Sequence, residues 1–356
     1  MIAYALRRLI WGVFLVLIMT WASFILFFVI PPNQVPAGQG RDTTQVTISK
    51  AMGLHEAPLP VQWAEYVWNA ARHQSLGTSI QTNTPVTETL ASAIPVTASL
   101  LVGGTLLFLL ISIPVGIISA LRPRSILDRM LMIFVFIGIA AHPAWIGLIL
   151  SYFFGYRLHL TPIAGYCDAV NPATACGGAL DWSYHLLLPW LSFAVLFAAL
   201  YARMIRASVI ESSQEDYVLT ARAKGGSRWH VLRVHVLRNA AIPIVMMLGM
   251  DLGLAFAGTL FVEQVFSLQG MGYTLVSAMN QQDFPVVLGI VMVVSAAVAV
   301  FTLIADLCYA ALDPRVRLAS APTRRRPRLP IRKSRAAAHS TLLAPEPQSQ
   351  RSTASS

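Results

Sequence analysis

Only a few side chains of this chain have types and positions that could do chemistry. Asp251 interrupts the apolar run LGMDLGLAFAG, Glu263 follows the end of the same apolar segment, and His142 precedes a proline in another apolar run. None of them stands at a recognisable catalytic spacing from a nucleophile or a second acid. The sequence also lacks G-x-x-x-x-G-K-[ST], H-E-x-x-H, G-x-S-x-G and paired C-x-x-C motifs. We therefore expect no catalytic residue, no metal site and no ATP bound by this chain.

The positions of these three residues indicate helix contacts or a role in a translocation path rather than catalysis. An ionised carboxylate in a membrane costs about 2.5–3.5 kcal/mol on insertion scales, so Asp251 should face water along a translocation path or a partner helix. His142 either satisfies backbone groups freed by Pro143 or belongs to a gate. Glu263 begins an external loop whose Gly270 and Gly272 allow a tight turn, which favours a place at an outer gate.

The elements that position these residues are membrane spans. The chain has 356 residues, of which 56% are hydrophobic and 12% charged, and its mean hydropathy is +0.62. This charge content is about half that of an ordinary soluble domain. A hydrocarbon core about 30 Å thick needs roughly 20 apolar residues per helix. Six segments meet or approach that length: Leu9–Ile30, Ile94–Leu121, Met130–Tyr156, Leu186–Ala202, Ala240–Val262 and Phe284–Ala305.

The distribution of charge predicts the orientation. The formal net charge is +10, and 22 of the 26 Lys and Arg residues lie in segments that are cytoplasmic if the N-terminus is cytoplasmic. This asymmetry is the positive-inside pattern, so both termini should be cytoplasmic and the number of spans even. A nucleic-acid binder would instead gather its cations and aromatic residues on one soluble face, so we expect no nucleic-acid partner.

The remaining segments are predicted to be peripheral. Residues 1–30 form the first span, 31–93 an external lobe with a helix at 59–72, and 94–312 the core of five spans. The lobe helix has an apolar stripe that should pack on the membrane-side protein surface: Val61, Ala64, Val67, Trp68 and Ala71. The tail, 313–356, is basic and should be disordered, either binding anionic headgroups or only anchoring the topology.

The external loop at 157–185 contains Cys167 and Cys176, in CDAVNPATAC. An external compartment is oxidising, and a ten-residue loop can close a disulfide. Two unpaired thiols are the alternative. Cys308, at the cytoplasmic end of the last span, should simply be packed.

A short helix is predicted at 214–224, between the fourth and fifth spans. Ser213 and Asp216 have the spacing of a capping box, Gly225-Gly226 supplies a left-handed stop, and a second helix start follows at Ser227. The segment is too short and too charged to span. It is either a stiff cytoplasmic element that transmits motion from a soluble partner or a basic loop that only fixes topology.

At this point the sequence resembles a known family. DYVLTARAKGGSRWHVLRVHVLRNAAIPI is similar to the cytoplasmic loop of permease subunits of ATP-binding-cassette importers, specifically the B-type subunit of dipeptide and oligopeptide systems. The similarity covers nearly the whole membrane part, in order: YALRRL, LPVQW, SLGTSI, IPVTASL, IPVGIISALRPRSILDR, HPAWIGLIL, VEQVFSLQGMG, QDFPVVLGIV and LDPRVR. It implies an all-α membrane protein with six transmembrane helices and the type I ABC importer fold.

The resemblance also implies partners and contacts. The helix at 214–224 would dock into a cleft of an ATPase subunit through Asp216, Tyr217, Thr220, Ala221, Arg222, Lys224 and Gly225. The complex would contain a second homologous permease, two cytoplasmic ATPase subunits or domains that bind ATP and Mg, and an extracytoplasmic substrate-binding protein. It would lie among lipids in the bacterial cytoplasmic (inner) membrane. Two departures stand out. The Glu-Ala-Ala consensus of the wider importer class would place its acid near Leu219, and this chain lacks that acid; PPNQVP replaces a Gly-Asp-Pro motif after the first span.

The implied function is import of di- and oligopeptides by alternating access. Related systems share these permease motifs, so nickel or another non-peptide solute is an alternative substrate. An intramembrane enzyme or a passive membrane anchor is the alternative from a different class.

Overall fold

The computed structural model describes residues 2–29, 48–55, 57–168 and 176–312 of the chain. Within these ranges the regular structure is helical, and the sole β feature is an isolated bridge between Thr78 and Pro85. The elements are α1 (Ile2–Val29), α3 (Leu59–His73), α4 (Val86–Leu121), α5 (Ile126–Ala140), α6 (Pro143–Leu150), the π-helical η1 (Ser151–Arg157), α7 (Ala179–Ser213), α8 (Asp216–Ala223), α9 (Arg228–Val231), the π-helical η2 (Leu232–Val236), α10 (Leu237–Val265), α11 (Met271–Asn280) and α12 (Phe284–Leu312). The predicted tail, 313–356, and much of the lobe, 31–47, lie outside the described residues.

Five helical segments of the described chain are long and apolar enough to cross a membrane, and they overlap five of the six predicted spans. One of them, Arg228–Gly249, begins before the predicted span Ala240–Val262. The predicted third span, Met130–Tyr156, is sharply bent at the His142-Pro143 pair, where a proline is expected to bend a helix. It consists of α5 and of α6 with η1, which meet at an angle of 104°, so the number of spans is six only if this bent pair counts as one. The cause is local: His142 precedes a proline and adopts extended backbone angles, φ −70° and ψ 137°, because the proline ring disfavours a helical residue before it.

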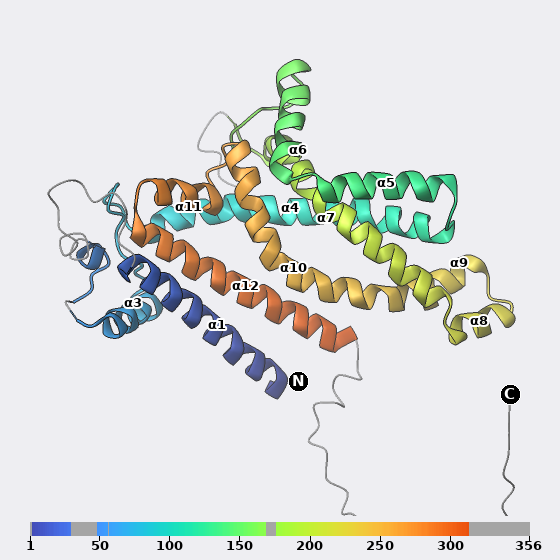
Figure 1. Cartoon of the computed structure of the whole chain (residues 1–356), viewed down its shortest axis with the longest axis horizontal. Helices are drawn as coiled ribbons and strands as arrows, with labels where there is room; N and C mark the ends of the chain where they lie inside the picture. Colours follow the sequence, from blue (N-terminus) through green and yellow to red (C-terminus); the bar gives the residue numbers. More distant parts are fainter. Residues whose placement is uncertain (1, 30–47, 56, 169–175, 313–356) are drawn as a thin grey trace, which may run out of the picture.

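The centre of the molecule is the pair α4 and α7, with α10 packed against α7 and α12 (Figure 1). Glycines let α4 and α7 approach closely: a Cβ on Gly103 would collide with the ring of Trp190, and one on Gly104 with Phe193. The Trp190 indole N–H also donates to the Ser99 carbonyl oxygen at 3.0 Å. The largest apolar cluster runs along this seam, so α7 is the most deeply buried span.

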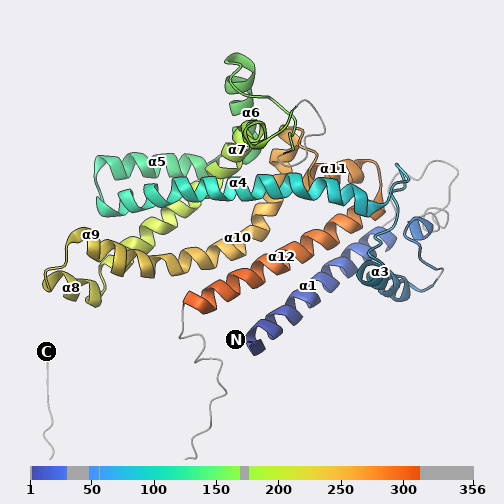
Figure 2. The same cartoon turned by 180° about the vertical axis from the view of Figure 1, so that it is seen from behind.

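Different short helices lie at the two ends of the bundle. Both views place α3 and α11 at one end and the short helices α8 and α9 at the other (Figures 1 and 2). Near the second end, Arg206 of α7 donates from Nε and Nη2 to the two carboxylate oxygens of Asp128, each at 2.9 Å. Asp128 also accepts from the Ser119 hydroxyl of α4, so one carboxylate joins α4, α5 and α7.

The lobe helix exists, but the predicted stripe is wrong. Val61 and Trp68 are 54% and 58% exposed, whereas Gln62 and Tyr66 are buried. A different face of α3 is therefore packed from the one predicted. This face contacts α1, and its Tyr66 belongs to a second apolar cluster. At the start of this region the His55 backbone N–H donates to Glu65 at 3.1 Å, and this bond together with the His55 ring lowers the pKa of Glu65.

Candidate functional site

The short helix between the fourth and fifth predicted spans begins later than predicted. Ser213 is the last residue of α7 rather than an N-cap, and its hydroxyl donates to the Val209 carbonyl oxygen at 2.6 Å. Glu215 precedes α8 instead, without a side-chain capping bond. The capping-box prediction is therefore wrong, and the helix covers 216–223 rather than 214–224. The competing bond within α7 is the reason, since a serine hydroxyl readily donates to the carbonyl four residues earlier.

The end of α8 is a tight left-handed turn. The Gly226 N–H donates to the Ala221 carbonyl oxygen at 3.1 Å and the Gly225 N–H to that of Arg222 at 3.0 Å, which are the paired bonds of a Schellman motif. Gly225 has φ +84°, so the predicted left-handed stop is confirmed at this residue. The turn reverses the chain and lets α9 start only a few residues later.

The short helix is held to the spans at several points. Val218 is fully buried in the main apolar cluster. The Asn239 amide donates to the Tyr217 hydroxyl at 2.7 Å, which joins α8 to the first turn of α10. Ser227 caps α9 by accepting from the His230 N–H at 3.3 Å, as its position predicts, and α9 then continues through η2 into α10. A force on α8 therefore acts directly on α10.

A groove of about 370 Å³ lies between α8 and the α9–η2 segment. Its lining combines a cation, two histidines, two hydroxyls and small apolar residues: Tyr217, Thr220, Ala221, Lys224, Gly226, His230, Val231 and His235. Four of the predicted coupling residues belong to this lining, whereas Asp216, Arg222 and Gly225 lie outside it on the exposed surface. Leu219 and Trp229 are 53% and 67% exposed at the same end. The surface is suited to another protein, because it offers exposed apolar side chains beside the exposed cations Arg222 and Lys224.

Asp251 lies in α10 and faces α7. The Tyr201 hydroxyl donates to its carboxylate at 2.9 Å, and Tyr201 itself is fully buried against Phe108. This bond joins two helices of the same chain. Asp251 is partly buried, and its role in the translocation path stays a prediction.

His142 caps the helix that follows it. Its Nδ1 accepts from the Ala144 N–H at 3.3 Å, and its ring lies 4.6 Å from that of Phe261 in α10. The histidine thus satisfies the backbone N–H that follows Pro143. This bond favours a structural role for His142, the first of the two alternatives that the sequence left open. A role in gating stays a prediction.

Glu263 lies in the last turn of α10 and does not begin a loop, so that expectation is wrong. Its carboxylate is fully buried and accepts from the Thr97 hydroxyl at 2.7 Å and from the Tyr273 N–H at 2.9 Å. Thr97 in turn accepts from the Met271 N–H at 2.8 Å. Glu263 thereby caps the start of α11, where free N–H groups favour an anion, and ties α11 to α4. Whether this arrangement opens and closes a gate stays a prediction.

Cys167 and Cys176 have Cα atoms 5.7 Å apart, within the range that a disulfide requires. The bridge stays a prediction, which this separation supports. His185 lies beside the pair, with its Nδ1 3.3 Å from the Cys167 sulfur.

One polar cluster was missed by reasoning from the sequence. Asp128 lies three residues after Ser125, the N-cap of α5. The Asp128 N–H donates to the Ser125 hydroxyl at 3.1 Å, the capping bond that this spacing predicts. The S-x-x-D pattern in RSILDR was therefore available as a helix-start signal. Its pairing with Arg206, 78 residues away, had no local signal.

These features together define a multi-pass helical membrane protein with a short helix anchored between two spans. The family model of the binding-protein-dependent transport system inner membrane component matches residues 112–318, and the model of the N-terminal part of such membrane components matches residues 1–101. The chain belongs to this family.

Several relatives cover almost the whole chain. A peptide permease protein of Brucella suis is 35% identical over 325 residues, covering 89% of this chain and 100% of the relative. A D,D-dipeptide transport system permease protein of Escherichia coli K12 is 36% identical over 331 residues, covering 87% and 96%. The dipeptide transport system permease protein of the same organism is 30% identical over 338 residues, covering 89% and 99%.

Family membership confirms the predicted class. The chain is a non-enzymatic membrane subunit with the type I ABC importer fold, and it lies in the inner membrane as a multi-pass protein. A transport system of this kind uses ATPase subunits and a substrate-binding protein as partners.

Proposed function

We propose that this chain forms one half of the translocation pore of an ATP-driven importer of di- and oligopeptides. The observation that carries the substrate class is the similarity to relatives named for peptide and dipeptide transport, at 30–36% identity along 87–89% of the chain. The reported relatives give no support to nickel or another non-peptide solute. The other half of the pore would be a second, homologous permease subunit.

In this proposal ATP and Mg are bound by two cytoplasmic ATPase subunits, and α8 carries their motion into the membrane. The direct path from α8 through η2 into α10 supports this role, as does the anchoring of Val218 and Tyr217. When the two ATPases close, they would draw the α8 helices of the two permeases together and open the pore outward. The exposed apolar face of the spans would contact membrane lipid and the second permease.

Uptake measured in reconstituted vesicles tests this proposal. The chain is co-expressed with the permease, ATPase and binding-protein subunits encoded beside it and is incorporated into proteoliposomes. We expect ATP-dependent uptake of labelled trialanine and no ATP-dependent uptake of nickel ions. Nickel uptake without peptide uptake would overturn the substrate class. ATP hydrolysis that moves neither solute, in a complex that assembles fully, would overturn the transport role.

A further inference from the structure

A second cavity lies at the end of the bundle opposite α8. It has a volume of about 650 Å³, and ligand pockets in proteins commonly measure 300–1,000 Å³. Three separate segments form it: the part of the lobe at 79–92, the loop around 165–168, and the segment from 267 to 283 that contains α11. Apart from Val96 and Val286, its lining residues belong to the segments that the charge distribution places outside the membrane.

Most of the side chains that line this outer groove can form hydrogen bonds, and its charged residues are acidic. Ten of its nineteen residues bear a hydroxyl and three are glutamines, so it offers hydrogen bonds of both kinds along its length. Asp168 and Asp283 are the charged residues of the lining, which includes no Lys, Arg or His among the described positions. In a chain with a formal charge of +10, this is a local reversal of sign.

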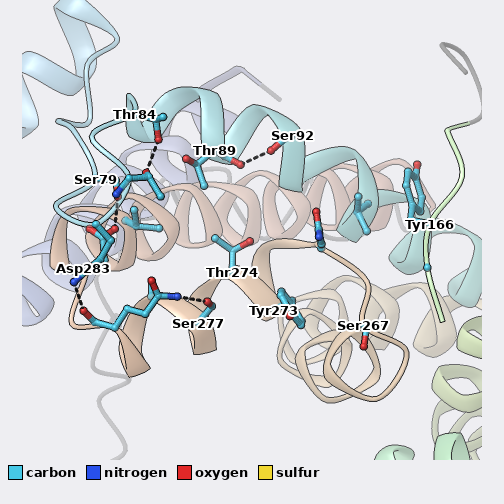
Figure 3. Close-up of a pocket in the computed structure, with 18 of the residues that line it drawn as sticks. Ser79, Thr84, Thr89, Ser92, Tyr166, Ser267, Tyr273, Thr274, Ser277 and Asp283 are labelled. Carbon is cyan, nitrogen blue, oxygen red and sulfur yellow. Dashed lines mark hydrogen bonds between the residues drawn. The ribbon is translucent and has the colours of Figure 1, made fainter. Parts of the chain in front are cut away.

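The walls of the groove are held in place by the chain itself. Asp283 is 5% exposed and accepts from the Ser79 hydroxyl and, at 3.1 Å, from the Ile80 N–H (Figure 3). The Gln81 amide donates to the Gln281 carbonyl oxygen at 2.8 Å. These bonds join the lobe to the start of α12, and no cation pairs with the Asp283 carboxylate among the described ion pairs. The groove is thus formed before any ligand arrives, and its negative charge is not neutralised within it.

We propose that this outer groove is a low-affinity binding site for the substrate itself, which takes the protonated amino end and the backbone of a short peptide. An ammonium group fits the exposed carboxylate of Asp168, whereas Asp283 is buried and already accepts two hydrogen bonds from the lobe. The hydroxyls and amides can pair with peptide N–H and C=O groups, which every peptide has, whatever its side chains. The inference rests on the proposed function, because it assigns the groove to the same solute.

Binding of two matched peptides tests the charge recognition. The whole transport complex, without the binding protein, is placed in lipid nanodiscs, and binding of trialanine and of N-acetyl-trialanine is followed by saturation-transfer NMR. We expect acetylation, which removes the ammonium charge, to weaken binding to the wild type about fivefold. Asp168→Asn should reduce this ratio roughly 2- to 5-fold, since Asp168 is exposed and its pairing is screened. Glu88→Gln, an exposed acid at the end of α4 outside the lining, is the control and should leave the ratio unchanged.

A second pair of variants tests whether the peptide binds in the outer groove. Ser92 faces the groove from α4, and Ala91 is its exposed neighbour outside the lining (Figure 3). Ser92→Trp should weaken trialanine binding at least tenfold, and Ala91→Trp should not. Equal binding of the two peptides to the wild type, or Ser92→Trp binding trialanine as well as Ala91→Trp does, overturns the inference. So does a Ser92→Trp complex that binds trialanine normally but has lost affinity for the binding protein, which would make the groove a docking surface for that protein.

Uptake separates this inference from the proposed function. If wild-type proteoliposomes with ATP and the binding protein take up no trialanine, the proposed function fails. If they do, and Asp168→Asn and Ser92→Trp leave the half-saturating trialanine concentration and the nanodisc binding unchanged, only the groove site fails.

Discussion

The turn that ends α8 offers the sharpest test of how this helix is held. Gly225 has φ +84°, and a Cβ added there would meet nothing within 4 Å. The cost of Gly225→Ala is therefore conformational rather than steric, and a left-handed residue with a Cβ costs roughly 1–2 kcal/mol. That free energy corresponds to a factor of about 5–30 in the population of the native turn. Relaxing the strain by unwinding would break the two backbone bonds from Gly225 and Gly226.

Asparagine provides the matched control, because its side chain tolerates the left-handed region at little cost. Gly226→Ala is a different perturbation: its Cβ would lie 2.9 Å from both the Ala221 carbonyl oxygen and the Val231 side chain, so α8 and α9 must separate. The assay is the number of trialanine molecules taken up per ATP hydrolysed in proteoliposomes. We expect this ratio to fall about 5- to 30-fold for Gly225→Ala and to stay within about twofold of wild type for Gly225→Asn. Equal ratios for the alanine and asparagine variants would refute the reasoning.

Three further predictions concern buried polar contacts. Asp128→Ala leaves Arg206 without its partner and should destabilise the protein by about 3 kcal/mol, seen as a lower melting temperature in detergent; an unchanged temperature would contradict the role of this ion pair. Glu263→Ala should speed amide hydrogen exchange at Tyr273 roughly fivefold or more, because a buried donor left without its acceptor costs about 1–3 kcal/mol, and exchange equal to that of Glu88→Ala would contradict the cap. Asp251→Asn should alter uptake of charged peptides with little effect on assembly; kinetics that match wild type for every peptide charge would leave Asp251 as a contact with Tyr201.

The sequence predicts the membrane spans well because the bilayer imposes a length and a composition that single segments must satisfy alone. It also predicts turns whose chemistry is local. Gly225 is an example, since only its own backbone decides whether the left-handed conformation is allowed. The cap at Ser227 is another, because the bond to the His230 N–H needs residues of one short segment.

The incorrect predictions concern residues whose structure depends on contacts with segments far away in the sequence. Ser213 does not cap α8, because its hydroxyl donates to a carbonyl oxygen of α7 instead. The buried face of α3 is the one that contacts α1, which is not its most apolar stripe. The bend at His142 followed from a proline, but its size of 104° depends on the packing of α6 against α7 and α10. Glu263 is buried because α11 folds back over it, a long-range fact that a single sequence does not reveal.

The central claim is that α8 lies in the cytoplasm and contacts an ATPase subunit. Thr220 is exposed on α8 and Leu180 is 85% exposed in the predicted external loop, so Thr220→Cys and Leu180→Cys, with Cys308→Ser, give a matched pair of reporters. In intact cells a membrane-impermeant maleimide should label Leu180→Cys and not Thr220→Cys. In inside-out vesicles Thr220→Cys should be labelled when the ATPases are stripped off, and it should be protected and crosslinked to an ATPase subunit when they are restored. Labelling of Thr220→Cys from outside the cell, or equal labelling with and without the ATPases, would contradict the account.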